Sequence, residues 1–97
     1  MEIVKTKNGD VLEVALQGRL DTITSEELAT SLEGESGFST IAFDFAKLEY
    51  LSSSGLRLLF AYRKKLGGKD KVIVKNVNPL ILEIFRVTGF GEQITIE

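Results

Sequence analysis

The sequence predicts an α/β domain with a mostly parallel mixed sheet, an antiparallel hairpin at its amino terminus, and helices that alternate with the later strands. Two apolar segments flank a turn signal at residues 7–10. Beyond them, the apolar period switches repeatedly between about 3.6 and two residues, as expected for alternating helices and strands. A chain of 97 residues fits one such domain, covering residues 1–97.

The hairpin is predicted from the pair Asn8 and Gly9, because both residues tolerate positive φ. It joins a strand at residues 3–6 to a second strand at 11–17. The second strand should bury one face, since its large apolar residues recur at every second position. These residues are Leu12, Val14 and Leu16.

The first helix is predicted at residues 25–33, after the segment GRLD at 18–21 leads out of the strand. Thr24 is the expected N-cap, with Glu27 three residues later reaching back to the cap. Ile23 is then expected to pack on Leu28 as a hydrophobic staple.

The next strand is predicted from the sequence STIAFDF, after the first helix stops near Gly34 or Gly37. Alternation places large apolar side chains on one face of it, with Ala42 and Asp44 on the other. The apolar residues are Ile41, Phe43 and Phe45.

A second helix follows the sequence LSSSG and ends at the sequence GGKD. Its buried stripe is expected from residues at helical spacing, and its polar face from three basic residues. The stripe comprises Leu56, Leu59, Phe60, Arg63 and Leu66, and the polar face Arg57, Lys64 and Lys65.

The last elements are a strand in KVIVKN, a third helix and a final strand in EQITIE. Three consecutive β-branched residues predict a strand covered on both faces. Asn78 and Pro79 begin the third helix, and Gly89 follows its end. The helix stripe is expected from Leu80, Ile81, Ile84 and Phe85, whereas Leu82 and Val87 lie off the stripe and are candidates for a contact surface.

The composition excludes several classes of function. The chain contains neither cysteine nor histidine, which removes disulfides, thiol nucleophiles, the usual zinc ligands and the commonest general base. Its net charge of −2 gives no basic face for nucleic acid. No segment is long and apolar enough for a signal peptide or a membrane span, so we expect a cytoplasmic protein with no direct membrane insertion.

The candidate site is the serine cluster Ser52, Ser53 and Ser54, at the amino end of the second helix. Free backbone N–H groups and the helix dipole suit this location to a hydroxyl or a phosphate. One serine is enough for an N-cap, so the cluster exceeds what capping requires. Nucleophilic catalysis is disfavoured because no adjacent base is evident, and we predict that the protein is not an enzyme.

Two carboxylates lie at the ends of predicted strands. Asp21 in GRLDT lies at the end of the second strand, and Asp44 in FDF lies near the end of the third. In a parallel sheet both could lie on the same edge as the serines. Each also has a simpler interpretation, Asp21 as a turn residue and Asp44 as a solvent-facing strand residue. Two carboxylates are weak grounds for a metal site, and we predict neither a metal nor a cofactor.

The chain resembles the sulfate-transporter and anti-sigma-factor-antagonist (STAS) domain, and within that family the small stand-alone antagonists. The similarity is carried by GRLDT, by IAFDFAKLEYLSSSGLRLL and by VTGF. In the family, the middle segment typically reads aspartate, serine, serine or threonine, glycine, leucine. This chain departs from that pattern with Ser52 in place of the aspartate and with Arg57 where a small residue is more common.

The resemblance implies a bacterial regulatory protein that binds an anti-sigma factor serine kinase and is switched off when the kinase phosphorylates Ser53, with Ser52 and Ser54 as alternatives. A serine phosphatase would be a second partner. The expected partner-binding residues are Asp21, Thr22, Asp44, Ser52, Ser53, Ser54, Gly55 and Arg57. An alternative within the same family is an accessory subunit of a membrane transport complex that binds its partner without phosphorylation.

Overall fold

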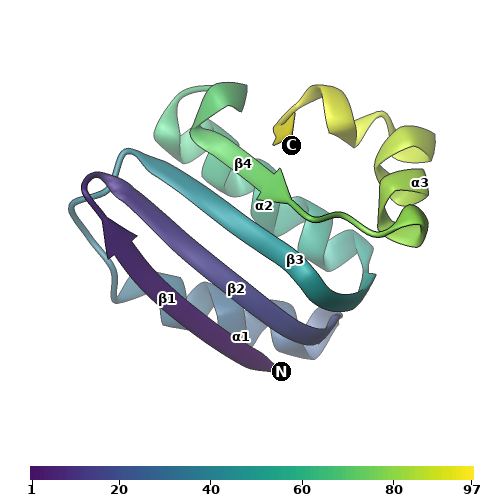
Figure 1. Ribbon diagram of the computed structural model, residues 1–97, viewed down its shortest axis with the longest axis horizontal. Coiled ribbons are helices and arrows are strands. Elements are labelled where there is room, and N and C mark those ends of the chain that lie inside the picture. The colour runs from purple at the N-terminus through teal and green to yellow at the C-terminus, as the bar shows by residue number, and fades with distance from the viewer.

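The computed structural model describes residues 1–97 as a five-stranded sheet with helices packed against it (Figure 1). The strands are β1 (Glu2–Asn8), β2 (Val11–Leu20), β3 (Thr40–Leu51), β4 (Val72–Lys75) and β5 (Thr95–Ile96). The helices are α1 (Thr22–Glu33), α2 (Ser53–Leu66) and α3 (Pro79–Thr88), with short 3-10 turns at Lys69–Lys71 and Phe90–Glu92. The predicted order of strands and helices is confirmed.

The strands lie in the sheet in the order of the sequence, β1-β2-β3-β4-β5. β1 is antiparallel to β2 and every other neighbouring pair is parallel, which confirms the predicted mixed sheet. The hairpin turn differs by one residue from the prediction. Asn8 pairs with Val11, so Gly9 and Asp10 form the turn, and of these Gly9 has positive φ, at 65°.

The core lies between the sheet and helices α1 and α2, which run behind β1, β2 and β3 in Figure 1, and it includes Ile81 and Phe85 of α3. The opposite face of these three strands carries no helix. The prediction that the fourth strand is covered on both faces is wrong, because only one face of β4 is fully buried. Val72 and Val74 point into the core and are fully buried, whereas Ile73 points to the other face and is only half-buried.

Strands β2 and β3 both extend beyond the predicted ranges. Residues 18–20 continue β2 instead of leading out of it, and β3 runs on from Phe45 to Leu51. Backbone pairing stabilises these extensions, since Leu20 pairs with Leu51. The extra length carries the ends of both strands past the end of β4, to the edge where α1 and α2 begin (Figure 1).

Helix α1 begins three residues earlier than predicted, because Asp21 and not Thr24 is the N-cap. Thr24 is the third residue of the helix and completes a capping box with Asp21. The predicted staple is also wrong, since Ile23 is 71% exposed while Leu28 is buried. The end of the helix at Glu33, with Gly34 as its C-cap, is as predicted.

Helices α2 and α3 largely follow the predicted caps, with differences in their buried stripes. In α2, Tyr62 joins the buried residues, and the predicted members Phe60, Arg63 and Leu66 are only half-buried. In α3, the prediction for Leu80 is wrong because this side chain is 55% exposed. The buried residues of α3 are Ile81 and Phe85. None of the helices is long and apolar enough to cross a membrane.

Candidate functional site

The ends of β2 and β3 bring the first turns of α1 and α2 together. Ser52, the residue that follows β3, donates its backbone N–H to the carbonyl oxygen of Leu20 at 2.8 Å. Directly beyond this bond, the side-chain oxygens of Thr22 and Ser54 lie 3.3 Å apart, so the two helix starts are in contact. We call this place, formed by residues 21–24 and 52–57, the helix-start edge.

At the start of α1, one oxygen of the Asp21 carboxylate accepts the backbone N–H groups of Ile23 and Thr24, each at 3.0 Å. The Thr24 hydroxyl lies 3.0 Å from the same oxygen and 2.6 Å from the carbonyl oxygen of Arg19, so its single proton is shared between these two acceptors. In return, the Asp21 N–H donates to Thr24 Oγ1 at 2.8 Å. The hydrogen bonds from Thr24 lower the pKa of Asp21 below its ordinary value, so this carboxylate is ionised at neutral pH.

At the start of α2, the cap is weaker and uncharged. Ser52 Oγ accepts the N–H of Gly55 at 3.3 Å, and no reciprocal bond is possible because glycine has no side chain. Gly55 instead allows close packing. A Cβ atom there would lie 2.5 Å from the side chain of Leu51 and 3.0 Å from that of Leu20.

The three serines of the cluster have different environments. Ser52 Oγ serves as the N-cap. Ser54 Oγ is half-buried and lies 3.3 Å both from Thr22 Oγ1 and from a guanidinium nitrogen of Arg57. Ser53 is the first residue of α2, is exposed, and makes no side-chain hydrogen bond within the chain. Ser53 therefore has the one free hydroxyl of the cluster.

The electrostatic setting of Ser53 favours negative charge. The first turn of α2 contains no acidic residue, so the partial positive charge at the helix amino end is not compensated within the helix. Arg57 is exposed on the next turn and has no ion-pair partner in the chain. A phosphate on Ser53 would thus meet free backbone N–H groups and a cation.

A shallow groove runs from the helix-start edge between α1 and α2. Its lining residues are Thr22, Ser25, Glu26, Ala29, Ser54, Arg57 and Leu58. Ser25 is 6% exposed, and its hydroxyl has no hydrogen-bond partner. The groove leads away from Ser53, along the line where the two helices pack.

Asp44 is not part of the helix-start edge. It lies eight residues before Ser52, which corresponds to roughly 25 Å of extended strand. One of its oxygens accepts the backbone N–H of Ala46 at 3.0 Å and the amide of Asn76 at 2.9 Å. The hydrogen bond from Asn76 and then that from Ala46 lower the pKa of Asp44. The expectation that Asp21 and Asp44 share an edge with the serines therefore holds for Asp21 only.

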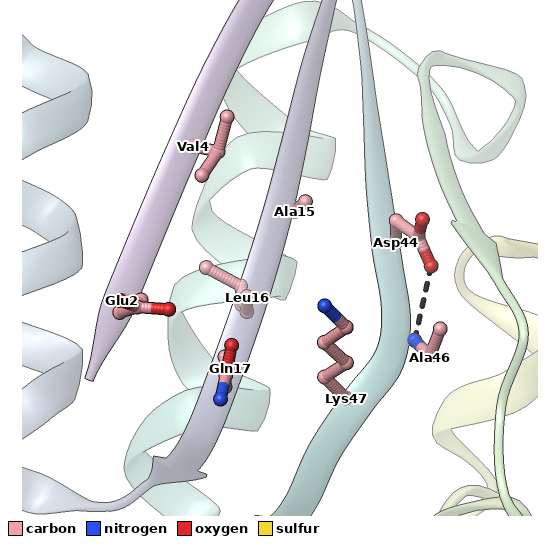
Figure 2. Close-up of a pocket in the computed structure, with 8 residues that line it drawn as sticks. All are labelled: Glu2, Val4, Ala15, Leu16, Gln17, Asp44, Ala46 and Lys47. Atoms are coloured by element: carbon pink, nitrogen blue, oxygen red, sulfur yellow. Dashed lines mark hydrogen bonds between the residues drawn. The ribbon is translucent and has the colours of Figure 1, made fainter.

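Figure 2 shows the place that Asp44 occupies, a hollow of about 240 Å³ on the helix-free face of the sheet. The hollow forms because Ala15 and Ala46 leave space between longer side chains. It is lined by Glu2, Val4, Ala15, Leu16, Gln17, Asp44, Ala46 and Lys47. No group of three or more acidic side chains in the chain is placed to hold a metal ion.

Ile23, which was predicted only as part of a hydrophobic staple, lies beside Thr22 at the helix-start edge and is 71% exposed. Single exposed apolar residues are common on protein surfaces, so Ile23 is of interest here for its position next to Thr22. The signal was present in the sequence, since the spacing of Asp21 and Thr24 is also that of a capping box. With Asp21 as the cap, Ile23 falls in the first turn of the helix.

The chain belongs to the STAS domain family, whose family model matches residues 2–97. Among curated proteins, it is similar to BtrV of Bordetella bronchiseptica, which is named as an anti-sigma factor antagonist. The two are 27% identical over 93 residues, which cover 93% of this chain and 80% of BtrV.

Among solved structures, the fold is similar to that of the anti-sigma factor antagonist SpoIIAA. The unphosphorylated form matches with a TM-score of 0.82 and 20% identity, over 99% of this chain and 88% of SpoIIAA. The phosphorylated form from Bacillus matches with a TM-score of 0.73 and 20% identity, over 99% and 91% of the two chains. These matches establish the STAS fold that the sequence predicted.

Proposed function

We propose that this protein is an anti-sigma factor antagonist that binds an anti-sigma factor serine kinase through the helix-start edge and is released when the kinase phosphorylates Ser53. The observation that carries the proposal is the free, exposed hydroxyl of Ser53 between two serines whose hydroxyls are occupied. The names of the relatives support the same regulatory class.

In the proposed reaction this chain supplies only the acceptor. Ser53 Oγ bonds to the γ-phosphorus of ATP held by the kinase, the bond between that phosphorus and the oxygen of ADP breaks, and ADP leaves. The hydroxyl proton passes to a base of the kinase. The carboxylate in the capping region, that of Asp21, accepts two backbone N–H groups of its own helix and suits a structural role.

The phosphate would change the docking surface while leaving the fold intact. It adds about 1.5 to 2 negative charges at a helix amino end, where the dipole favours them. Ser53 is exposed, so the added group needs no rearrangement of the core. A loss of about 3 kcal/mol in binding free energy would weaken the complex roughly a hundredfold, which is enough for a switch.

The proposed contact surface combines apolar and polar groups of both helices. Ile23 supplies exposed apolar area on α1, and Thr22, Ser53 and Arg57 supply polar groups at the same helix-start edge. Asp44 lies outside this surface, on another face of the sheet. A role for Asp44 in partner binding would therefore need a second, separate contact.

The test is intact-mass analysis of the purified protein incubated with ATP and its cognate kinase. The wild type should gain one phosphate, and Ser53→Ala should gain none. Ser52→Ala and Ser54→Ala are the matched controls and should still be modified. A phosphate gained by Ser53→Ala would overturn the site, and co-purification with a transporter that is equally strong for Ser53→Asp would favour the transport accessory role.

A further inference from the structure

Arg57 is placed to reach a group attached to Ser53. Both residues lie in α2, four positions apart, and side chains at this spacing are neighbours on one helix face, with Cβ atoms about 5 to 6 Å apart. Both residues are exposed, so the space between them is open to solvent. The two residues therefore form a pair across the first turn of the helix.

The present contact of Arg57 is weak. One guanidinium nitrogen donates to the neutral Ser54 hydroxyl at 3.3 Å, and no carboxylate lies within ion-pair distance. A guanidinium prefers a phosphate, which it can bind through two parallel charge-assisted hydrogen bonds. A phosphate on Ser53 would therefore compete successfully with Ser54 for Arg57.

The other cations near the helix-start edge are less suitable. Arg19 stacks on Tyr50, with its guanidinium carbon 4.5 Å from the ring centroid, and also lies close enough to lower the pKa of Asp21. The remaining basic residues of α2 are in its last turn, on Arg63, Lys64 and Lys65. The carboxylates of Asp21 and Glu26 would repel a phosphate, so its stabilisation falls to Arg57 and the helix amino end.

We propose that Arg57 is the phosphate-binding residue of the modified protein: its guanidinium leaves Ser54 and pairs with the phosphate on Ser53. This inference rests on the proposed phosphorylation of Ser53. Phosphorylation then changes the helix-start edge twice, because it adds a phosphate and also withdraws Arg57 from the surface offered to the partner.

The test uses full-length protein with phosphoserine installed at position 53 during translation, so that its result does not depend on any kinase. Phosphorus-31 NMR is followed through a pH titration. The second pKa of a phosphoserine is near 6, and pairing with Arg57 should lower it by about half a unit relative to Arg57→Ala. The difference should shrink at about 1 M salt, because the pair is exposed.

Two variants make the result specific. Arg57→Lys keeps the positive charge but cannot bind the phosphate in a bidentate way, and should give a phosphate pKa between those of the wild type and Arg57→Ala. Arg19→Ala is the matched control, since it removes the arginine that lies near this edge on Tyr50, and should leave the phosphate pKa as in the wild type. The inference would be overturned if the phosphate pKa were the same in the wild type and in Arg57→Ala. It would also be overturned if Arg19→Ala raised the phosphate pKa as much as is expected for Arg57→Ala. Failure of the kinase to modify Ser53 would instead contradict the proposed function.

Discussion

Helices α1 and α2 begin side by side at the end of neighbouring strands, but their first turns are built differently. Asp21 caps α1 with a charged carboxylate, and Thr24 completes a reciprocal capping box. Ser52 caps α2 through a single bond of 3.3 Å, and the corresponding third position is Gly55. The start of α1 is thus stabilised by its own side chains, whereas that of α2 depends on packing against Leu20 and Leu51.

The difference between the two caps shows that local stability is lower at the start of α2 than at the start of α1. A carboxylate at the cap of α2, as the family pattern has, would place a negative charge beside Ser53. Ser52 leaves the amino end of α2 positive and Ser53 free. Departures from the best local choice tend to occur at functional sites, and here the departure is confined to one of two adjacent helix starts.

The largest expected effect comes from filling the space at Gly55. Gly55→Val places a Cβ atom 2.5 Å from the Leu51 side chain, and both neighbouring leucines are buried. We expect a loss of about 2 to 3 kcal/mol in the free energy of unfolding, measured by urea denaturation.

The matched control for this prediction is Gly34→Ala at the end of α1. A Cβ atom there would be 3.8 Å from its nearest neighbour, an ordinary contact, and φ is −77°. This variant should change stability by less than about 0.5 kcal/mol. If Gly55→Val were equally well tolerated, the start of α2 would not depend on close packing.

Removal of the charged cap of α1 should have the next largest effect. Asp21→Ala deletes the acceptor of two backbone N–H groups at the helix start, and we expect the midpoint of thermal unfolding at pH 7 to fall by roughly 5 °C. The pKa of Asp21 is lowered in the folded protein, so its stabilising effect is complete above the unfolded value of 3.8 and is lost as the pH falls through the folded pKa.

The difference between wild type and Asp21→Ala should therefore shrink below about pH 3.8. Ser52→Ala provides the comparison, because a hydroxyl does not titrate in this range and its effect should not vary with pH. A difference for Asp21→Ala that stays constant from pH 7 to pH 2 would show that the carboxylate charge contributes nothing at this cap.

Most of the fold could be predicted from the periodicity of apolar residues and from turn residues. The arrangement of the candidate site could not, because it depends on contacts between elements distant in the sequence. The alternation of Leu12, Val14 and Leu16 predicted a strand and its buried face, and both were found. The start of α1 was placed wrongly because Thr24 and Glu27 also fit a capping box. Asp21 is the N-cap because the Thr24 hydroxyl is directed to the carbonyl oxygen of Arg19, 2.6 Å away. This contact forms only when β2 extends to Leu20.

The distribution of hydroxyl contacts could not be predicted either. LSSSG indicates a helix start but not which serine is free, because the partner of Ser54 is Thr22, 32 residues away in the sequence. The placement of Asp44 failed for a related reason. Its distance from the serines depends on how far β3 continues after Phe45, and that length is set by pairing with β2.

The smallest expected effect comes from giving α2 the kind of cap that α1 has. Ser52→Asp places a carboxylate at the helix amino end, where the dipole favours it, and should raise the free energy of unfolding by about 0.5 kcal/mol. The same charge beside Ser53 should oppose a phosphate there. In protein with phosphoserine at position 53, the second pKa of the phosphate should therefore be higher in Ser52→Asp than in the wild type. A stabilised variant with an unchanged phosphate pKa would mean that the neutral cap matters for folding alone and does not prepare Ser53 for modification.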